Sequence, residues 1–153
     1  MNDLKLPARM DRMPGVDTDF AVWAERQIGL LRGRNFQELD LEHLIEELES
    51  LVANDRRELR SRLVILLIHL LKCRFQAARK SRCWLSTIAE QRDQLAGLFE
   101  KSPSLKPFVP EVLADCYARA VRRAAIETGL PIAAFPLANP FSPAEVLDDD
   151  FVP

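Results

Sequence analysis

The chain has 153 residues, of which 48% are hydrophobic and 29% charged, and its formal net charge is -2. These values are ordinary for one globular domain, and they exclude a disordered chain, a collagen-like repeat and a disulfide scaffold. The near-neutral charge also argues against a dedicated nucleic-acid binder, because such proteins are strongly basic.

The N-terminal part of the chain is predicted to be a flexible lead-in followed by a helix. Residues 1–16 contain two prolines and a glycine without any apolar period, and residues 17–153 are predicted to form a single helical domain. The first helix is expected from about residue 18 to 32, with Asp17 or Thr18 as its cap. One buried face is expected to hold Phe20, Trp23, Gln27, Leu30 and Leu31. Gly33 suits the left-handed position that follows such a helix.

A long amphipathic helix is expected next. After Asp40 as a cap, apolar residues keep helical spacing over 41–76 without glycine or proline. One helix of that length would measure roughly 54 Å at 1.5 Å per residue, which is long for this domain. A bend near Ala53 to Asp55 is therefore expected, and the sequence leaves open whether the segment is one helix or two.

The second half of the chain is predicted to hold two more main helices. Ser81 is expected to cap a helix over about 82–101, and a further helix runs to Thr128 with Gly129 as its stop. Five prolines then divide the tail into turns, with a helical turn at 142–145. The sequence thus predicts an all-α antiparallel bundle of about four main helices around residues 63–71, including a long central helix, with a proline-rich C-terminal tail over its surface.

The cysteines and the apolar segments indicate in which cellular compartment the protein resides. Cys73, Cys83 and Cys116 are spaced too irregularly for a disulfide framework or a zinc signature. No apolar stretch near the N-terminus suits an export signal. The most apolar run, residues 63–71, is shorter than the about 20 residues that a spanning helix needs. We therefore expect a cytoplasmic protein with no membrane partner.

Charge is segregated in the middle of the chain. Residues 38–55 hold seven acidic side chains and no Lys or Arg, whereas residues 56–82 hold nine basic side chains and one acid. A candidate patch for an anion or a nucleic acid lies in the second stretch, beside Phe75 and Trp84. Pairing between the two stretches, or plain solvation, is the alternative interpretation. The residues of this basic patch are Arg74, Arg79, Lys80 and Arg82.

Motifs for catalysis are sparse. Five singly scattered glycines exclude a phosphate-binding loop, and a di-iron bundle usually needs two Glu-x-x-His pairs, whereas this chain has two histidines in all. Glu46, Glu47 and His69 remain as candidates for a metal-dependent hydrolase, with a solvated acidic face and a structural histidine as the alternatives. The pattern favours a protein that is not an enzyme, and it predicts no catalytic residue, no metal ligand and no cofactor.

The segment NFQELDLEHLIEELESL at residues 35–51 resembles the opening signature of a bacterial family, domain-of-unknown-function family twenty-nine. Later strings follow in the order of that family: HLLK at 69–72, QR at 91–92, SPSL at 102–105 and ETGLP at 127–131. The resemblance covers roughly residues 17–153 and implies a helical fold, but it implies no activity, substrate or catalytic residue. It draws attention to the polar motif formed by Glu46, Glu47, His69, Lys72, Arg79 and Trp84.

These observations favour an interaction module that self-associates or binds a protein partner without chemistry of its own. A helix with one acidic and one basic half can pair antiparallel with a second copy across a two-fold axis, so a homodimer is the expected assembly. The alternative is a nucleic-acid-associated regulator that uses the basic patch. A metal-dependent hydrolase ranks last.

Overall fold

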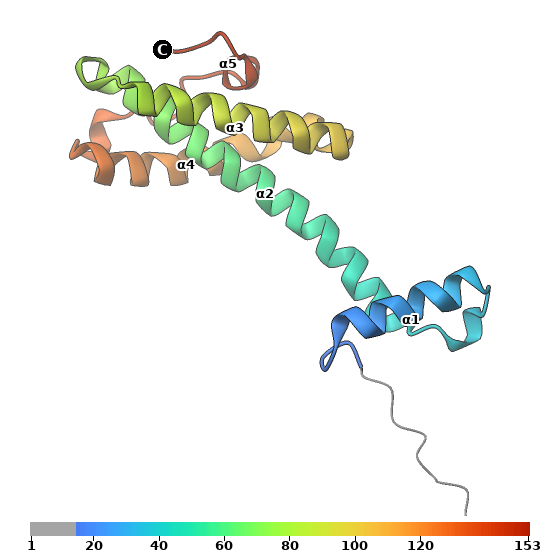
Figure 1. Cartoon of the computed structure of the whole chain (residues 1–153). Helices are drawn as coiled ribbons and strands as arrows, with labels where there is room; N and C mark the ends of the chain where they lie inside the picture. The colour runs from blue at the N-terminus through green and yellow to red at the C-terminus, as the bar shows by residue number, and fades with distance from the viewer. Residues whose placement is uncertain (1–14) are drawn as a thin grey trace, which may run out of the picture. The chain divides into compact units, whose positions relative to one another are not determined.

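The computed structural model describes residues 15–153, and its regular structure is entirely helical (Figure 1). No strand occurs among these residues, which confirms the predicted all-α class. The lead-in expected over residues 1–16 lies almost wholly outside them. The α-helices are α1 (Phe20–Arg32), α2 (Leu41–Phe75), α3 (Arg82–Lys101), α4 (Val109–Thr128) and α5 (Pro143–Leu147), and short 3₁₀ turns lie at Phe36–Glu38, Ala77–Arg79, Pro103–Phe108 and Ile132–Ala134.

The chain divides into two compact units. The N-terminal unit is Met1–Ser50, of which residues 15–50 are described, and it contains α1 and the start of α2. The C-terminal unit is Leu51–Pro153, and it contains the rest of α2 with α3, α4 and α5. The single domain expected over residues 17–153 stays a prediction.

The N-terminal end of α1 is capped by Asp19. Its carboxylate accepts a 3.1 Å hydrogen bond from the Val22 N–H, as an N-cap side chain does. The expectation that Asp17 or Thr18 would cap the helix is wrong. Thr18 is already engaged in the preceding turn, because its hydroxyl donates to the Gly15 carbonyl at 3.0 Å.

α1 ends at Arg32, as the sequence predicts, but the left-handed residue that follows it lies one position later than expected. Gly33 keeps a right-handed conformation with φ -78°, and its N–H donates to the Gly29 carbonyl. Arg34 takes the positive φ of 57° instead, and Asn35 N–H then closes the turn on the Leu30 carbonyl. The prediction of a left-handed Gly33 is therefore wrong, because the helical hydrogen bonding continues through it.

α2 is one uninterrupted helix of 35 residues, which settles the choice between one helix and two over this segment. Helical structure continues through Ala53 to Asp55, where a bend was expected. Burial changes along the helix, since all of its buried residues lie at or after Leu59. α2 thus belongs to both units, with an exposed beginning and a buried end.

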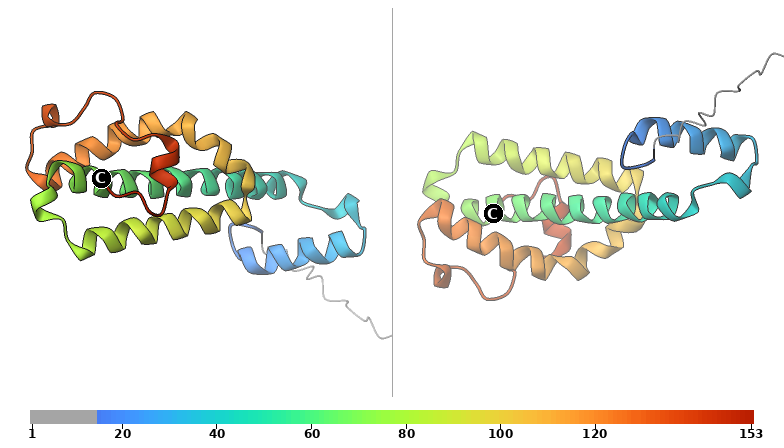
Figure 2. Two further views of the ribbon diagram at one scale, coloured as in Figure 1. Left: turned by 90° about the horizontal axis from the view of Figure 1, so that it is seen from above. Right: turned by 90° about the horizontal axis from the view of Figure 1, so that it is seen from below.

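The C-terminal unit packs the end of α2, α3 and α4 side by side, and consecutive helices run in opposite directions (Figure 2). Along α2, the side chains facing this bundle are completely buried. This arrangement confirms the predicted bundle around residues 63–71 and its long central helix. The leucines with 0% exposure are Leu59, Leu63, Leu66, Leu67, Leu70 and Leu71.

Local signals stop and start the other helices where the sequence predicts. The Ser81 hydroxyl accepts the Trp84 N–H at 3.3 Å and caps α3. Gly129 follows α4 with a left-handed φ of 74°, which a residue with a Cβ rarely adopts. No helix among residues 15–153 has both the length and the apolarity to cross a membrane.

The C-terminal tail is part of the core. Phe135, Phe141 and Val146 are only 5%, 3% and 0% exposed, and the Phe135 ring lies edge-on to the Phe75 ring at 5.3 Å. The predicted helical turn is confirmed as α5, whose first turn carries a capping box. The expectation that the tail only covers the surface is wrong, because three helices leave one side of the core open and these side chains fill it.

Candidate functional site

A polar seam joins α1 to the start of α2 in the N-terminal unit. The Trp23 Nε1–H donates to Asp40 Oδ2 at 3.0 Å, and the Asp40 N–H donates to Gln27 Oε1 at 2.9 Å. His43 Nδ1 lies 2.8 Å from the same Asp40 oxygen. Trp23 and Gln27 are the buried residues of α1. Two side chains of α1, Trp23 and Gln27, therefore form hydrogen bonds to Asp40 at the start of α2.

The charges of Asp40 and His43 support each other. Hydrogen bonds from His43 and Trp23 hold the pKa of Asp40 below its ordinary value. The hydrogen bond to Asp40 raises the pKa of His43. Both side chains are partly exposed, at 35% for Asp40 and 39% for His43, so solvent weakens the pair. Because both shifts favour the charged forms, the strength of the seam depends on pH.

Next to this seam lies a surface that we call the open face. Its members are large apolar side chains with exposed fractions from 45% to 62%. Single exposed apolar residues are normal, but contiguous apolar patches usually mark binding surfaces. The open face is the candidate functional site of the N-terminal unit. Its residues are Phe20, Ile28 and Leu31 of α1 and Leu41, Ile45 and Leu48 of α2.

Helical periodicity places the members of the open face on one side of the hairpin. At about 100° per residue, they lie on average roughly a fifth of a turn from the residues of the seam on α1 and roughly two fifths of a turn on α2, in the same rotational sense. α1 and the start of α2 run in opposite directions (Figure 2). Rotations of the same sense on antiparallel helices point to the same side, so the two stripes lie on one side of the hairpin.

Lys72 and Trp84 of the polar motif come together in the C-terminal unit. Lys72 is 8% exposed, and its Nζ donates to Glu127 Oε2 at 2.9 Å and lies 4.6 Å from the centroid of the Trp84 ring. These residues come from α2, α4 and α3, so the cluster ties three helices together. A buried ammonium needs such partners. The cluster accounts for both motif residues as supports of the fold, and a binding role stays a prediction.

The candidates for a metal site fall in different units. Glu46 and Glu47 belong to the N-terminal unit and His69 to the C-terminal unit. His69 Nδ1 donates to the Ile65 carbonyl one turn earlier, at 2.9 Å. No group of three or more His, Cys, Asp or Glu side chains that could hold a metal ion occurs in the described part of the chain. The geometry gives the hydrolase hypothesis no support.

The basic patch is partly engaged by the tail of its own chain. The Arg74 guanidinium lies 5.6 Å from the centroid of the Phe141 ring, and Lys80 Nζ donates to the Pro153 main-chain oxygen at 2.7 Å. Arg79 and Arg82 are exposed, near the connection between α2 and α3. Half of the patch thus has an intramolecular role. Nucleic-acid binding by the patch stays a prediction.

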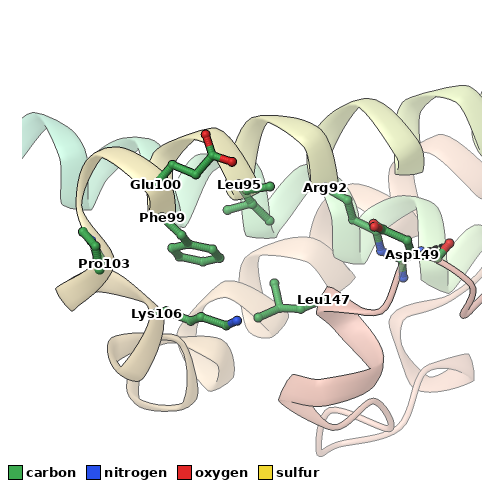
Figure 3. Close-up of a pocket in the computed structure, with 9 residues that line it drawn as sticks. Arg92, Leu95, Phe99, Glu100, Pro103, Lys106, Leu147 and Asp149 are labelled. Atoms are coloured by element: carbon green, nitrogen blue, oxygen red, sulfur yellow. Dashed lines mark hydrogen bonds between the residues drawn. The ribbon is translucent and has the colours of Figure 1, made fainter.

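A cleft of about 380 Å³ lies between α3 and the end of the tail, and Arg92 forms part of its wall (Figure 3). The Arg92 guanidinium donates to the main-chain carbonyls of Val146, Glu145 and Asp149 at 3.0, 3.2 and 3.3 Å. Burial lowers the pKa of Arg92, and the charge of Asp149 opposes that shift. Arg92 acts as a clamp that fixes α5 and the following turn on α3.

Sequence reasoning missed the open face and the Arg92 clamp for different reasons. The spacing of Phe20 and Leu31 marks one side of α1 as apolar, but spacing does not tell whether another element covers that side. The predicted buried face of α1 is confirmed at Trp23 and Gln27, but the prediction is wrong for Phe20 and Leu31, which are 52% and 45% exposed. The Arg92 guanidinium donates its hydrogen bonds to main-chain carbonyls. Because every residue has such a carbonyl, the sequence does not indicate which ones Arg92 contacts.

Comparison with known proteins places the chain in one family. No curated protein and no solved structure matches it. The model of one family matches residues 16–152, which include parts of both units. The chain therefore belongs to the family described as Domain of unknown function DUF29.

Proposed function

We propose that this protein is a self-associating interaction module whose N-terminal unit binds a second copy through the open face. The observation that carries the proposal is the exposure of six large apolar side chains in a unit of α1 and the start of α2. A two-fold axis needs only one self-complementary surface, and the open face supplies it to both copies.

The apolar contact supports a dimer of moderate strength. Burying the exposed half of a Leu, Ile or Phe side chain gains about 1 kcal/mol, so the open faces of two copies contribute roughly 12 kcal/mol together. Association itself costs about 4 to 15 kcal/mol. A dimer that dissociates on dilution is the expected outcome.

Charge opposes this contact. Residues 15–50 hold nine acids and three bases, a charge of -6, which the open faces of two copies bring together. An antiparallel pairing that places Glu46 and Glu49 near Arg56 and Arg57 of the other copy would centre near residues 51–53 and would leave the two open faces apart. Because salt screens the repulsion between the acidic units, the dimer should strengthen as the salt concentration rises.

Sedimentation velocity of the full chain over a range of concentrations tests the proposal. We expect a monomer–dimer equilibrium for the wild type and a monomer for the double variant Ile45→Asp, Leu48→Asp. Leu137→Asp is the matched control, because Leu137 is fully exposed in the other unit, and it should leave the dimer unchanged. A wild type that stays monomeric, or a double variant that still dimerises, contradicts the proposal.

Charge reversal tests the contact separately. Glu46→Arg with Glu49→Arg should strengthen the dimer, because it lowers the repulsion between the two acidic units. A dimer that this double variant weakens would contradict a contact through the open face.

We place this module in the cytoplasm. Cys73, Cys83 and Cys116 are all free, and Cys83 is exposed. Exposed unpaired thiols suit a reducing compartment. Localisation of a fluorescently tagged full chain tests this placement, and export of the tagged protein would contradict it.

A further inference from the structure

A second surface, in the C-terminal unit, is strongly positively charged. α2 and α4 border a cleft of about 570 Å³ on their outer side. Four of the seven residues that line it are arginines: Arg60 of α2 and Arg119, Arg122 and Arg123 of α4. We call this the arginine cleft.

The arrangement of the arginine cleft follows from helical spacing. Arg119, Arg122 and Arg123 stand at i, i+3 and i+4, so their side chains are neighbours on one face of α4. That face adjoins the buried stripe of Ala120 and Ala124, and it therefore lies beside α2. Arg60 reaches the cleft from α2 and is held near the Phe108 ring, at 5.9 Å from its centroid.

The positive charge of the cleft is not neutralised locally. No Asp or Glu lines it, and within residues 15–153 none of the four arginines belongs to an ion pair. The acid one turn after Arg123 is Glu127, which is already paired with Lys72. Asp115, one turn before Arg119, is the other acid near this face of α4. Like charges held in one cleft repel each other unless an anion joins them.

We propose that the arginine cleft binds a compact anion that carries two or more phosphoryl groups. A guanidinium donates two parallel hydrogen bonds to a phosphoryl group, so several arginines can hold several such groups. The volume falls in the range of about 300 to 1,000 Å³ that is typical of small-ligand sites. Val64 and Ile65 of α2 add an apolar wall for an uncharged part of the ligand.

A compact anion fits the observations better than a nucleic acid does. Residues 51–153 contain 15 Lys and Arg against 12 Asp and Glu, which gives the unit a charge of only +3. A long polyanion gains affinity from many phosphate contacts spread over a basic surface. Here the charge is concentrated in one cleft, where a small ligand reaches all of it. This proposal is independent of self-association, because it concerns the other unit.

Calorimetric titration of the full chain with inorganic tripolyphosphate tests the proposal. We expect saturable binding, and a loss of at least tenfold in affinity for Arg119→Gln with Arg122→Gln. Both side chains are exposed, so the variant should fold, and its thermal melting checks this. The matched control is Arg57→Gln with Lys106→Gln, which removes two exposed basic side chains outside the cleft and should bind like the wild type.

Two further titrations decide what kind of ligand is involved. Vesicles that contain a phosphatidylinositol bisphosphate distinguish the sources of the same chemistry: binding to vesicles identifies a lipid headgroup, and binding only to the free anion identifies a soluble ligand. Three results overturn the proposal. These are absent binding of tripolyphosphate, equal binding by the Arg119 and Arg122 variant, and tighter binding of a single-stranded oligonucleotide than of tripolyphosphate.

Discussion

The two units of this chain are built from the same kind of amphipathic helix, but they differ in whether the apolar face of that helix is buried. In the C-terminal unit, α2, α3, α4 and the tail enclose a core in which leucines of α2 are completely buried. In the N-terminal unit, two helical segments meet at a polar seam and leave their large apolar side chains at 45% to 62% exposure. The number of covering elements, rather than the apolar period, decides whether a helix face is buried.

α2 has an exposed apolar face in the N-terminal unit and a buried one in the C-terminal unit. Leu48 and Leu67 belong to apolar stripes of the same period, but Leu48 is 62% exposed and Leu67 is 0% exposed. Each stripe needs a partner surface, which Leu67 finds within its own chain. For Leu48 we propose that the partner is a second copy.

The largest effect is expected from a matched pair of leucine substitutions. Leu67→Ala should lower the free energy of unfolding of the C-terminal unit by about 3 kcal/mol, because it removes buried methyl groups and leaves a cavity. In dilute, monomeric protein, Leu48→Ala should change the free energy of unfolding by less than about 0.5 kcal/mol, as substitutions at exposed sites usually do. Urea unfolding followed by circular dichroism measures both. Equal losses would contradict the difference between the two units.

A somewhat smaller effect is expected from opening the Arg92 clamp. Arg92→Met removes three hydrogen bonds from a charged donor to carbonyls of the tail, and we expect a loss of about 2 kcal/mol in unfolding free energy. Arg92→Lys keeps the charge but replaces the planar guanidinium by one ammonium group. It should therefore restore only part of the lost unfolding free energy. Limited proteolysis should cut first after α4 in the Met variant. A variant as stable and resistant as the wild type would show that the tail is not held by this contact.

The smallest effect is a pH dependence of the seam in the N-terminal unit. The raised pKa of His43 gives stabilisation that is complete below its ordinary pKa of about 6.5 and disappears as pH rises through the pKa of the folded state. The lowered pKa of Asp40 gives stabilisation that is lost only as pH falls below about 4. The seam should therefore be tightest between about pH 4 and 6.5.

The Trp23 indole N–H reports this titration, because it donates to Asp40. In NMR spectra from pH 5 to 8.5, its signal should move with a midpoint above about 6.5, the ordinary value for histidine. The movement should vanish in His43→Gln. The Trp84 indole in the other unit is an internal reference. A midpoint at or below about 6.5, or a pH-dependent movement of the Trp23 signal that persists in His43→Gln, would contradict the pairing of Asp40 with His43.

The fold was largely predictable because helix starts, stops and periods are local. Ser81, Gly129 and the helical turn at 142–145 depend on the backbone within a few residues of themselves, and all three are predicted where they occur. The tail and the seam were not predicted, because Phe141 and Trp23 find their partners through the tertiary arrangement. Sequence spacing likewise marks the open face as apolar without saying what covers it.

The arginines of α4 illustrate the same limit for a binding site. Arg119, Arg122 and Arg123 share a helix face by spacing alone, which the sequence does reveal. That Arg60 faces them across a cleft depends on how α2 packs against α4. The basic patch from Arg74 to Arg82 is denser in sequence, and yet two of its members hold the tail. Charge density along the chain is therefore a poor guide to charge that is free to bind.

The most direct test of the account is amide hydrogen exchange of the full chain at two protein concentrations, one below and one above the dissociation constant of the dimer. Amides of α1 and of the first turns of α2 should gain protection at the higher concentration, because dimer formation stabilises the unit that contains them. Amides in the buried part of α2, Leu59 to Cys73, should exchange equally slowly at both. Protection of α1 that does not depend on concentration would contradict the claim that a second copy completes the N-terminal unit.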